Sequence, residues 1–331
     1  MPPAPPLLEI KNLATSFYDD DIIVRAVRGV DIKVNQGEVL AIVGESGCGK
    51  SVTALSILRL LAMPPAHFDS GSINFNGSNL LGLPETDMQN IRGNDISMIF
   101  QEPMTSLNPL FTVGDQISET IIHHQNKTRA EARTLTLNLL HKVAIPSPEV
   151  RIDQYPHELS GGMKQRIMIA IAIACRPSLL IADEPTTALD VTIQAQILNL
   201  LISLKQETKM SILLITHNLG IVAQFADRVA VMYAGKVVEE APVEILFNNP
   251  MHPYTRGLLK SLSSNDKDCK LESIPGAVPH PAYLPQGCSF NPRCKDVMPR
   301  CEQQSPELNA PNLETHQTAC WLHDKSLNEH S

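Results

Sequence analysis

The fold is decided by the stretch Gly44-Glu45-Ser46-Gly47-Cys48-Gly49-Lys50-Ser51. It fits the pattern G-x-x-x-x-G-K-[ST] and follows the apolar run Val39–Val43, so we expect it where a buried strand turns into a helix. There the glycines let the backbone wrap around phosphate oxygens, Lys50 adds a positive charge, and the Ser51 hydroxyl can bind Mg2+. Without that context the stretch would be an ordinary glycine-rich turn. With it, the stretch predicts a nucleotide site in an α/β fold.

Further apolar runs also end in polar side chains: Ile96–Phe100 precedes Gln101, Leu180–Ala182 precedes Asp183 and Glu184, and Ile212–Ile215 precedes Thr216 and His217. Parallel strands present their carboxyl ends at one edge of a sheet, which is where ligands bind. Asp183 suits a Mg2+-associated acid, and Glu184 suits a base that polarises water. A surface acidic pair or a lone histidine is common by itself. Together with the run that precedes the phosphate loop, however, four expected strands end in polar residues, which predicts a catalytic edge.

A second glycine-containing segment reads Leu159-Ser160-Gly161-Gly162-Met163-Lys164-Gln165. Ser160 is a good N-cap for a helix over Met163–Cys175, and the glycines beside it leave amide groups bare for an anion. An ordinary capped helix with a flexible lead-in is the alternative. Because the first loop already occupies one helix N-terminus, a second one that can bind an anion predicts a shared, composite site.

Composition limits the function classes. The chain has 331 residues, 43% of them apolar, which is enough for one large domain and an appendage. A net charge of -8 argues against non-specific binding to nucleic acid or anionic membranes as the main activity. The longest apolar stretch, Ile167–Cys175, is too short to span a bilayer, and Met1–Pro6 has no signal-peptide pattern. We therefore expect a protein that neither inserts into a membrane nor is secreted.

The chain divides into regions of different pattern. Residues 8 to about 100 predict short strands around the first loop, about 102–176 predict helices, and 177–241 predict alternating strands and helices. The helical region is therefore an insertion into the nucleotide-binding sheet. After Pro242 prolines multiply, which predicts loops rather than more sheet.

Four cysteines cluster near the end of the chain: Cys288, Cys294, Cys301 and Cys320, with five, six and eighteen residues between them. Disulfides are improbable in a reducing compartment, which leaves an iron-sulfur cluster, a structural Zn2+ site or free thiols. The tight C-x2-4-C pairs typical of zinc sites are missing. The region lies far in sequence from the nucleotide motifs, so we expect a structural or redox role and ATP binding that is independent of these cysteines.

In identity, order and spacing, the motifs resemble those of ATP-binding-cassette (ABC) ATPases over about residues 8 to 245: the phosphate loop, Gln101, Leu159–Gln165, Asp183-Glu184, Ala188-Leu189-Asp190 and His217. The resemblance implies an α/β fold, an ABC-type nucleotide-binding domain of the P-loop NTPase class. It would have a RecA-like core, an antiparallel β subdomain and an inserted helical subdomain of about residues 102–176. This domain would occupy residues 1–245, and a loop-rich C-terminal extension with the four-cysteine metal site would occupy 246–331.

The resemblance also implies residue roles. Glu184 would be the general base, His217 the γ-phosphate switch, and Gln101 a coupling sensor. Mg2+ would be bound by Ser51, Gln101 and Asp183. Contacts to ATP would come from Gly44, Glu45, Ser46, Gly47, Cys48, Gly49, Lys50, Ser51, Val52, Ser160, Gly161, Gly162, Gln165 and Asp190. In this family two cassettes dimerise head to tail, so Ser160-Gly161-Gly162 of one would cap the γ-phosphate held by the other. The adenine-stacking aromatic could be Phe17 or Tyr18, or neither.

The segment His252-Pro253-Tyr254-Thr255 and the segment Glu102–Pro109 resemble the ATP-binding subunits of bacterial dipeptide, oligopeptide and nickel importers. Without the family, His252 and Tyr254 would be packing residues at a helix start. The resemblance implies ATP hydrolysis that powers peptide uptake, a [4Fe-4S] cluster in the extension with Zn2+ as the alternative, and a peripheral location on the cytoplasmic face of the inner membrane. Implied partners are a second ABC ATPase subunit, usually a paralogue, two transmembrane permease subunits and an extracytoplasmic peptide-binding protein, with no nucleic acid.

Other functions stay open at this point. A nickel or other small-solute importer would carry the same motifs, because cargo is chosen by other subunits. A soluble ABC ATPase acting on nucleic acid or ribosomes would be expected to have a coiled-coil insertion, tandem cassettes or basic surfaces, and none is evident in the sequence. A regulatory module without turnover is disfavoured by the presence of Glu184 and His217.

Overall fold

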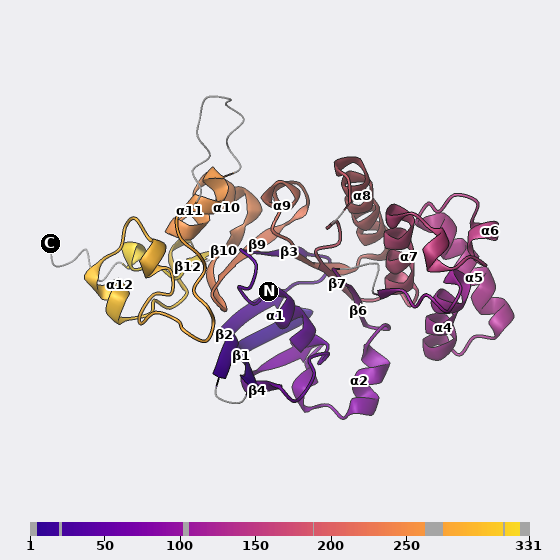
Figure 1. The fold of residues 1–331 in the computed structure, drawn as a ribbon, viewed down its shortest axis with the longest axis horizontal. Helices are drawn as coiled ribbons and strands as arrows, with labels where there is room; N and C mark the ends of the chain where they lie inside the picture. The colour runs from indigo at the N-terminus through magenta and orange to yellow at the C-terminus, as the bar shows by residue number, and fades with distance from the viewer. Residues whose placement is uncertain are drawn as a thin grey trace. The chain divides into compact units, whose positions relative to one another are not determined.

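The computed structural model describes residues 5–19, 22–101, 106–187, 189–261, 274–313 and 315–324. These residues form two compact units (Figure 1). Unit 1 takes its residues from Met1–Val34, Val39–Leu81 and Ile215–Ser331, and unit 2 from Asn35–Glu38 and Gly82–Leu214. Each unit is described by itself.

Unit 1 contains an antiparallel sheet with the strand order β2-β1-β4-β5, of which Figure 1 labels β2, β1 and β4. Its strands are β1 (Leu8–Asp19), β2 (Ile22–Val34), β4 (Ala66–Phe75) and β5 (Ser78–Asn79). The sequence predicted short strands here, but β1 and β2 have 12 and 13 residues. Register shifts after Ile10 and Thr15 let the two strands stay paired over this length, because a bulge absorbs the added twist.

A second set of strands in unit 1 follows the order β11-β12-β10-β9-β3. They are β3 (Val39–Val43), β9 (Arg228–Tyr233), β10 (Lys236–Pro242), β11 (Asn309–Leu313) and β12 (His316–Thr318). β3 pairs in parallel with β9, and β10 pairs antiparallel with β9 and β12. The expectation of no further sheet after Pro242 is therefore wrong. Pro311 lies on the edge strand β11, in the irregular stretch between the paired residues Asn309 and Leu313, and edge strands with irregular pairing tolerate proline.

The helices of unit 1 are α1 (Lys50–Ile57), α9 (Leu219–Phe225), α10 (Val243–Asn248), α11 (Pro253–Lys260) and α12 (Pro299–Gln303), with the short 3-10 turns η1 (Leu80–Gly82, whose last residue belongs to unit 2), η3 (Asn291–Arg293) and η4 (Trp321–His323).

One apolar core joins the β3 and β9 strands to the extension. Val43, Val231 and Tyr233 pack there with Tyr254 and Phe290. The C-terminal extension is thus built into the same core as the strand that leads to the phosphate loop.

Unit 2 combines three strands with a helical region. The strands β6 (Ile96–Ile99), β7 (Leu179–Asp183) and β8 (Ser211–Ile215, whose last residue belongs to unit 1) follow the order β8-β7-β6, and β6 is parallel to β7. The helices are α2 (Glu85–Ile91), α4 (Val113–Gln125), α5 (Arg129–Lys142), α6 (Pro148–Arg151), η2 (Pro156–Glu158), α7 (Gly161–Ile173) and α8 (Val191–Thr208). Figure 1 shows α4 to α7 gathered together, as the helical pattern predicts.

Local signals explain where these helices begin. Thr128 and Glu131 form a reciprocal capping box at α5, and Thr112 caps α4 through the amide of Asp115. Apolar side chains of α5 at helical spacing, including Leu140, are buried against α4 and α7. In the described part of the chain, no helix has the length and apolar character needed to cross a membrane.

Candidate nucleotide-binding and catalytic site

The phosphate loop lies between β3 and α1, as its sequence context predicts. Gly44 has a φ of 155°, and a Cβ there would lie 2.2 Å from the carbonyl oxygen of Met232. Gly49 has a φ of 103°, and a Cβ there would lie 2.4 Å from the carbonyl oxygen of Ala26. Both positions therefore require glycine, because the neighbouring backbone leaves no room for a side chain.

Lys50 folds back onto its own loop. Its Nζ donates hydrogen bonds to the carbonyl oxygens of Gly44 at 2.8 Å and Glu45 at 3.0 Å, and it lies 3.7 Å from Cys48 Sγ. Cys48 is fully buried, and burial raises the pKa of its thiol although Lys50 opposes the shift. Ser51 and Val52 follow in the first turn of α1 and are half-buried. The loop is thus preformed around a buried ammonium group.

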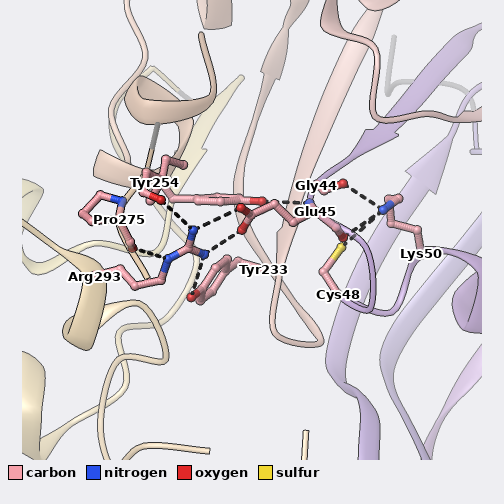
Figure 2. A network of polar contacts seen from close by, with 9 residues as sticks. Gly44, Glu45, Cys48, Lys50, Tyr233, Tyr254, Pro275 and Arg293 are labelled. Carbon is pink, nitrogen blue, oxygen red and sulfur yellow. Dashed lines mark hydrogen bonds and ion pairs between the residues drawn. The ribbon is translucent and has the colours of Figure 1, made fainter. Parts of the chain in front are cut away.

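Glu45 is turned toward the C-terminal extension, which sequence reasoning missed. Its backbone N–H donates to the Tyr254 hydroxyl at 2.9 Å, and its carboxylate accepts hydrogen bonds from Arg293 at 2.6 and 3.0 Å (Figure 2). The extension, although far from the phosphate loop in sequence, therefore contacts it in the fold. His252 and Tyr254 do begin a helix as expected, but Tyr254 also contacts the loop, and no sequence pattern links positions 209 and 248 residues apart.

His217 follows β8 and is exposed, in unit 1. The residue before it is tied to the strand that leads to the phosphate loop, because the Thr216 N–H donates to the carbonyl oxygen of Ile42 at 3.2 Å. The residue after it, Asn218, caps α9 by accepting from the amides of Gly220 and Ile221. His217 therefore sits between two fixed backbone positions, in the turn from a strand to a helix.

In unit 2, Glu184 and Gln101 come together at the ends of two paired strands. Gln101 Nε2 donates to Glu184 Oε2 at 3.1 Å, and the Thr187 hydroxyl donates to the same oxygen at 2.8 Å. Glu184 has a backbone φ of 47°. Residues other than glycine rarely adopt this left-handed conformation, and those that do are often found at functional sites. Asp183, the last residue of β7, is 4% exposed. The sequence prediction that these strand ends share one edge is confirmed for β6 and β7.

The Ser160–Gln165 segment also packs within unit 2. The Ser160 hydroxyl accepts from the Met163 N–H at 3.3 Å, so the predicted cap is present, although α7 begins at Gly161 rather than Met163. Gln165 is 2% exposed and donates to the carbonyl oxygen of Pro185 at 2.7 Å, directly after Glu184.

Asp190 caps α8 by accepting from the Ile193 N–H at 2.9 Å. A Cβ on Gly162 would lie 3.2 Å from Ile193 Cγ2, so α7 and α8 approach closely where the glycine stands. The segment Ala188-Leu189-Asp190 includes Ala188, which lies outside the described residues, as do Glu102–Thr105.

The two adenine-stacking candidates lie near the end of β1 in unit 1. Phe17 is half-buried, whereas Tyr18 is 45% exposed. The Tyr18 hydroxyl donates to Asp69 Oδ1 at 3.1 Å, and its ring meets His67 edge to face at 4.9 Å. Tyr18 thus presents an accessible ring held on the sheet, and its role in adenine binding stays a prediction.

The four clustered cysteines line one small cavity of about 10 Å³, together with His252 and Phe290. Burial raises the pKa of three of these thiols, Cys288, Cys294 and Cys320, that of Cys320 to about 12, and neighbouring cysteines add to the shift. Among the described residues, no group of three or more His, Cys, Asp or Glu side chains is arranged so that it could hold a metal ion. Cys269, which the sequence sets apart from this cluster, lies outside the described residues.

Comparison with known proteins gives two family matches. Residues 27–187 match the family described as ABC transporter, and residues 238–301 match the family described as oligopeptide/dipeptide transporter, C-terminal region. The chain is 50% identical to the oligopeptide transport ATP-binding protein AppD of Bacillus subtilis, over 98% of this chain and 99% of that protein. It is 49% identical to the dipeptide transport ATP-binding protein DppD of Bacillus subtilis, over 96% and 95%.

Among solved structures, the chain is similar to the ATP-binding cassette MJ0796 in a dimeric, post-hydrolysis state bound to ADP and Pi. The match has a TM-score of 0.65 and 26% sequence identity, and it covers 71% of this chain and 98% of that chain.

Proposed function

Since the chain belongs to the ABC transporter family, in the branch that carries the oligopeptide/dipeptide transporter C-terminal region, we propose that it is the ATP-hydrolysing subunit of a peptide importer. The observation that carries this proposal is the joint presence of a preformed phosphate loop and of the Glu184–Gln101 pair at a strand edge. Relatives of similar length that are named for peptide transport support the choice of cargo.

In the proposed reaction a water molecule attacks the γ-phosphorus of ATP, the bond to the β–γ bridging oxygen breaks, and ADP and inorganic phosphate are the products. Glu184 orients this water and accepts its proton, while Lys50 leaves the loop carbonyls to stabilise charge on the phosphates. Ser51, Asp183 and Gln101 offer oxygen atoms, the donor type that Mg2+ prefers, and the bound ion would neutralise phosphate charge. His217 would sense the γ-phosphate. Glu184 Oε2 accepts hydrogen bonds from Gln101 and Thr187, so the position of the base, and with it turnover, would depend on Gln101.

The active form would be a head-to-tail pair of cassettes. The N-terminus of α7, with Ser160, Gly161 and Gly162, would then face the γ-phosphate held by the partner cassette, and Asp190 would lie in the same composite site. The bound state named for the related MJ0796 cassette is dimeric, which supports this arrangement. We propose that the partner is a paralogous subunit rather than a second copy of this chain.

The chain would work at the cytoplasmic face of the inner membrane, held there by two permease subunits, with an extracytoplasmic peptide-binding protein delivering cargo. A nickel or other small-solute importer is the main alternative, since this chain does not choose the cargo. A soluble cassette that acts on nucleic acid or ribosomes is the alternative of a different class. Net charge of -8 and the C-terminal region shared with peptide transporters favour the importer.

For the extension we propose a [4Fe-4S] cluster held by Cys288, Cys294, Cys301 and Cys320, with Zn2+ as the alternative. Support comes from four thiols that line one cavity. A single Zn2+ needs all its ligands close to one point, whereas a cluster distributes four thiolates over several iron atoms.

The test of the proposed function is to isolate the chain from membranes and identify what accompanies it. We expect permease subunits, a second cassette and a binding protein that holds a peptide. A binding protein loaded with nickel would move the assignment to the metal importers. Co-purification with ribosomes or nucleic acid, and no permease, would contradict the importer reading altogether.

A further inference from the structure

The C-terminal extension holds the phosphate loop through an ion pair. Arg293 donates two hydrogen bonds to the carboxylate of Glu45, at 2.6 and 3.0 Å, in the two-pronged geometry that makes arginine–carboxylate pairs directional (Figure 2). The Arg293 side chain is 4% exposed and the Glu45 side chain 33%. The arginine end of the pair is therefore shielded from solvent. If the pair were broken, water could not easily take the place of the carboxylate, and the buried charge would cost free energy.

Arg293 also makes hydrogen bonds to residues other than Glu45. Its Nε donates to the carbonyl oxygen of Pro275 at 2.9 Å, and its Nη1 lies 3.4 Å from the Tyr233 hydroxyl (Figure 2). The hydrogen bond to Glu45 raises the pKa of Arg293, so the guanidinium stays charged. Since both sides of the guanidinium are engaged, its position is set by the fold of the extension rather than by Glu45 alone.

Tyr254 supplies a second, independent contact. It is fully buried in the core, its ring centroid lies 4.6 Å from that of Tyr233, and its hydroxyl accepts the Glu45 N–H at 2.9 Å. Burial raises the pKa of Tyr254, so the hydroxyl is neutral. The main chain at Glu45 is therefore fixed from the extension as well. The carbonyl oxygens of Gly44 and Glu45, on either side of that amide, are the acceptors of Lys50.

We propose that Arg293 and Tyr254 are positioning residues for the phosphate loop, through which the C-terminal extension sets the affinity of the chain for ATP. Arg293 has a second effect, because it neutralises a carboxylate that would otherwise repel phosphate from within the loop. The inference rests on the proposed function, since it requires this loop to bind the phosphates of ATP.

A purely structural role of Arg293 and Tyr254 predicts a different result. If their contacts only stabilise the packing of the extension, losing them lowers thermal stability without a specific effect on nucleotide affinity. Arg300 offers a matched control, because it also lies in the extension and also pairs with a carboxylate, Asp324, at 3.2 Å. Its contacts among the described residues are with its own surroundings in the extension, and its guanidinium packs on the ring of Trp321.

The experiment measures equilibrium binding of a fluorescent ATP analogue to the full chain, with competition by ATP. Arg293→Gln should weaken ATP binding about tenfold, because it removes a charge-assisted contact and leaves Glu45 unpaired. Glu45→Gln should weaken it less. The double variant should bind as tightly as Glu45→Gln alone, since no unpaired carboxylate remains. Arg300→Gln should bind ATP within about twofold of the wild type.

Wild-type affinity in Arg293→Gln overturns the proposal, and so does a double variant that is as weak as Arg293→Gln. Should Arg293→Gln fail to fold, Tyr254→Phe keeps the ring and removes only the acceptor of the Glu45 N–H. It should weaken ATP binding about threefold, and an unchanged affinity would then overturn the proposal. If the wild-type chain itself binds no ATP, the proposed function fails instead, so the two failures are distinguishable.

Discussion

Gln101 and Glu184 are joined side chain to side chain, with Gln101 Nε2 3.1 Å from Glu184 Oε2, although they lie 83 residues apart in the chain. Gln101 follows β6 and Glu184 follows β7, and these strands pair in parallel, so the sheet brings the two residues together. A residue that leads into the helical region of unit 2 is therefore in direct contact with the proposed base.

Replacing Gln101 with Ala should reduce transport more than it reduces ATP affinity. The change removes one hydrogen bond to Glu184. It also removes the side chain through which binding and hydrolysis of ATP would change the conformation of the helical region. In vesicles that contain the assembled importer, peptide uptake per ATP hydrolysed should fall by about tenfold or more.

Thr187→Ala is the control for this variant, because it removes another hydrogen bond to Glu184 Oε2 and leaves Gln101 in place. It should alter turnover without lowering uptake per ATP. A collapse of ATP binding in Gln101→Ala, with normal coupling of the residual activity, would show that Gln101 is a ligand and not a sensor.

Gln165→Ala should lower turnover while leaving ATP affinity nearly unchanged. Gln165 is buried and holds the carbonyl oxygen of Pro185, next to Glu184, so its loss lets the base shift from its position. We expect kcat to fall about tenfold, measured in the assembled complex at saturating ATP. Gln194→Ala, which removes a comparable bond to the carbonyl oxygen of Leu189, is the matched control. Equal losses in the two variants would indicate general loosening of unit 2.

Serine at each cysteine of the cluster should lower metal content and also weaken ATP binding. Arg293 lies between Cys288 and Cys294, and the Cys288 N–H donates to the carbonyl oxygen of Cys301 at 2.8 Å, so loosening this region displaces Arg293 from Glu45. Sequence order alone predicts unaffected ATP binding. Cys175→Ser, in unit 2, should change neither quantity.

Metal analysis of protein prepared without oxygen separates the two candidate groups. A cluster gives about four iron atoms with matching sulfide and a visible absorption that bleaches on reduction, whereas a zinc site gives about one zinc per chain. Stoichiometric zinc without iron would exclude the cluster. Neither metal, together with wild-type behaviour of all four variants, would mean that the cysteines are free thiols.

Much of the fold follows from local signals in the sequence. The glycine pattern and the preceding apolar run locate the turn from β3 to α1, because both Gly44 and Gly49 stand where a Cβ would collide with backbone. Ser160 and Asp190 cap the helices α7 and α8, and N-caps are readable from residue type and context. Helical spacing likewise predicts the helical region of about residues 102–176, in which α4 to α7 lie.

Contacts between distant segments could not be read in this way. The bond between Glu45 and Tyr254 and the ion pair between Glu45 and Arg293 depend on how the extension packs onto the β3–β9 core, and no periodicity records that packing. The pairing of β12 with β10 was missed for a related reason. A three-residue strand carries too few residues for an alternating pattern, so a proline-rich segment predicts loops alone.

The most direct test of the central claim, that this chain hydrolyses ATP with Glu184 as the base, is ATP turnover by the assembled importer with Glu184→Gln. The amide keeps the shape of the side chain and cannot accept the proton of water, so ATP binding should persist while kcat falls about a hundredfold or more. Binding measured on the same preparation confirms that the site is intact. Turnover at the wild-type rate would contradict the account.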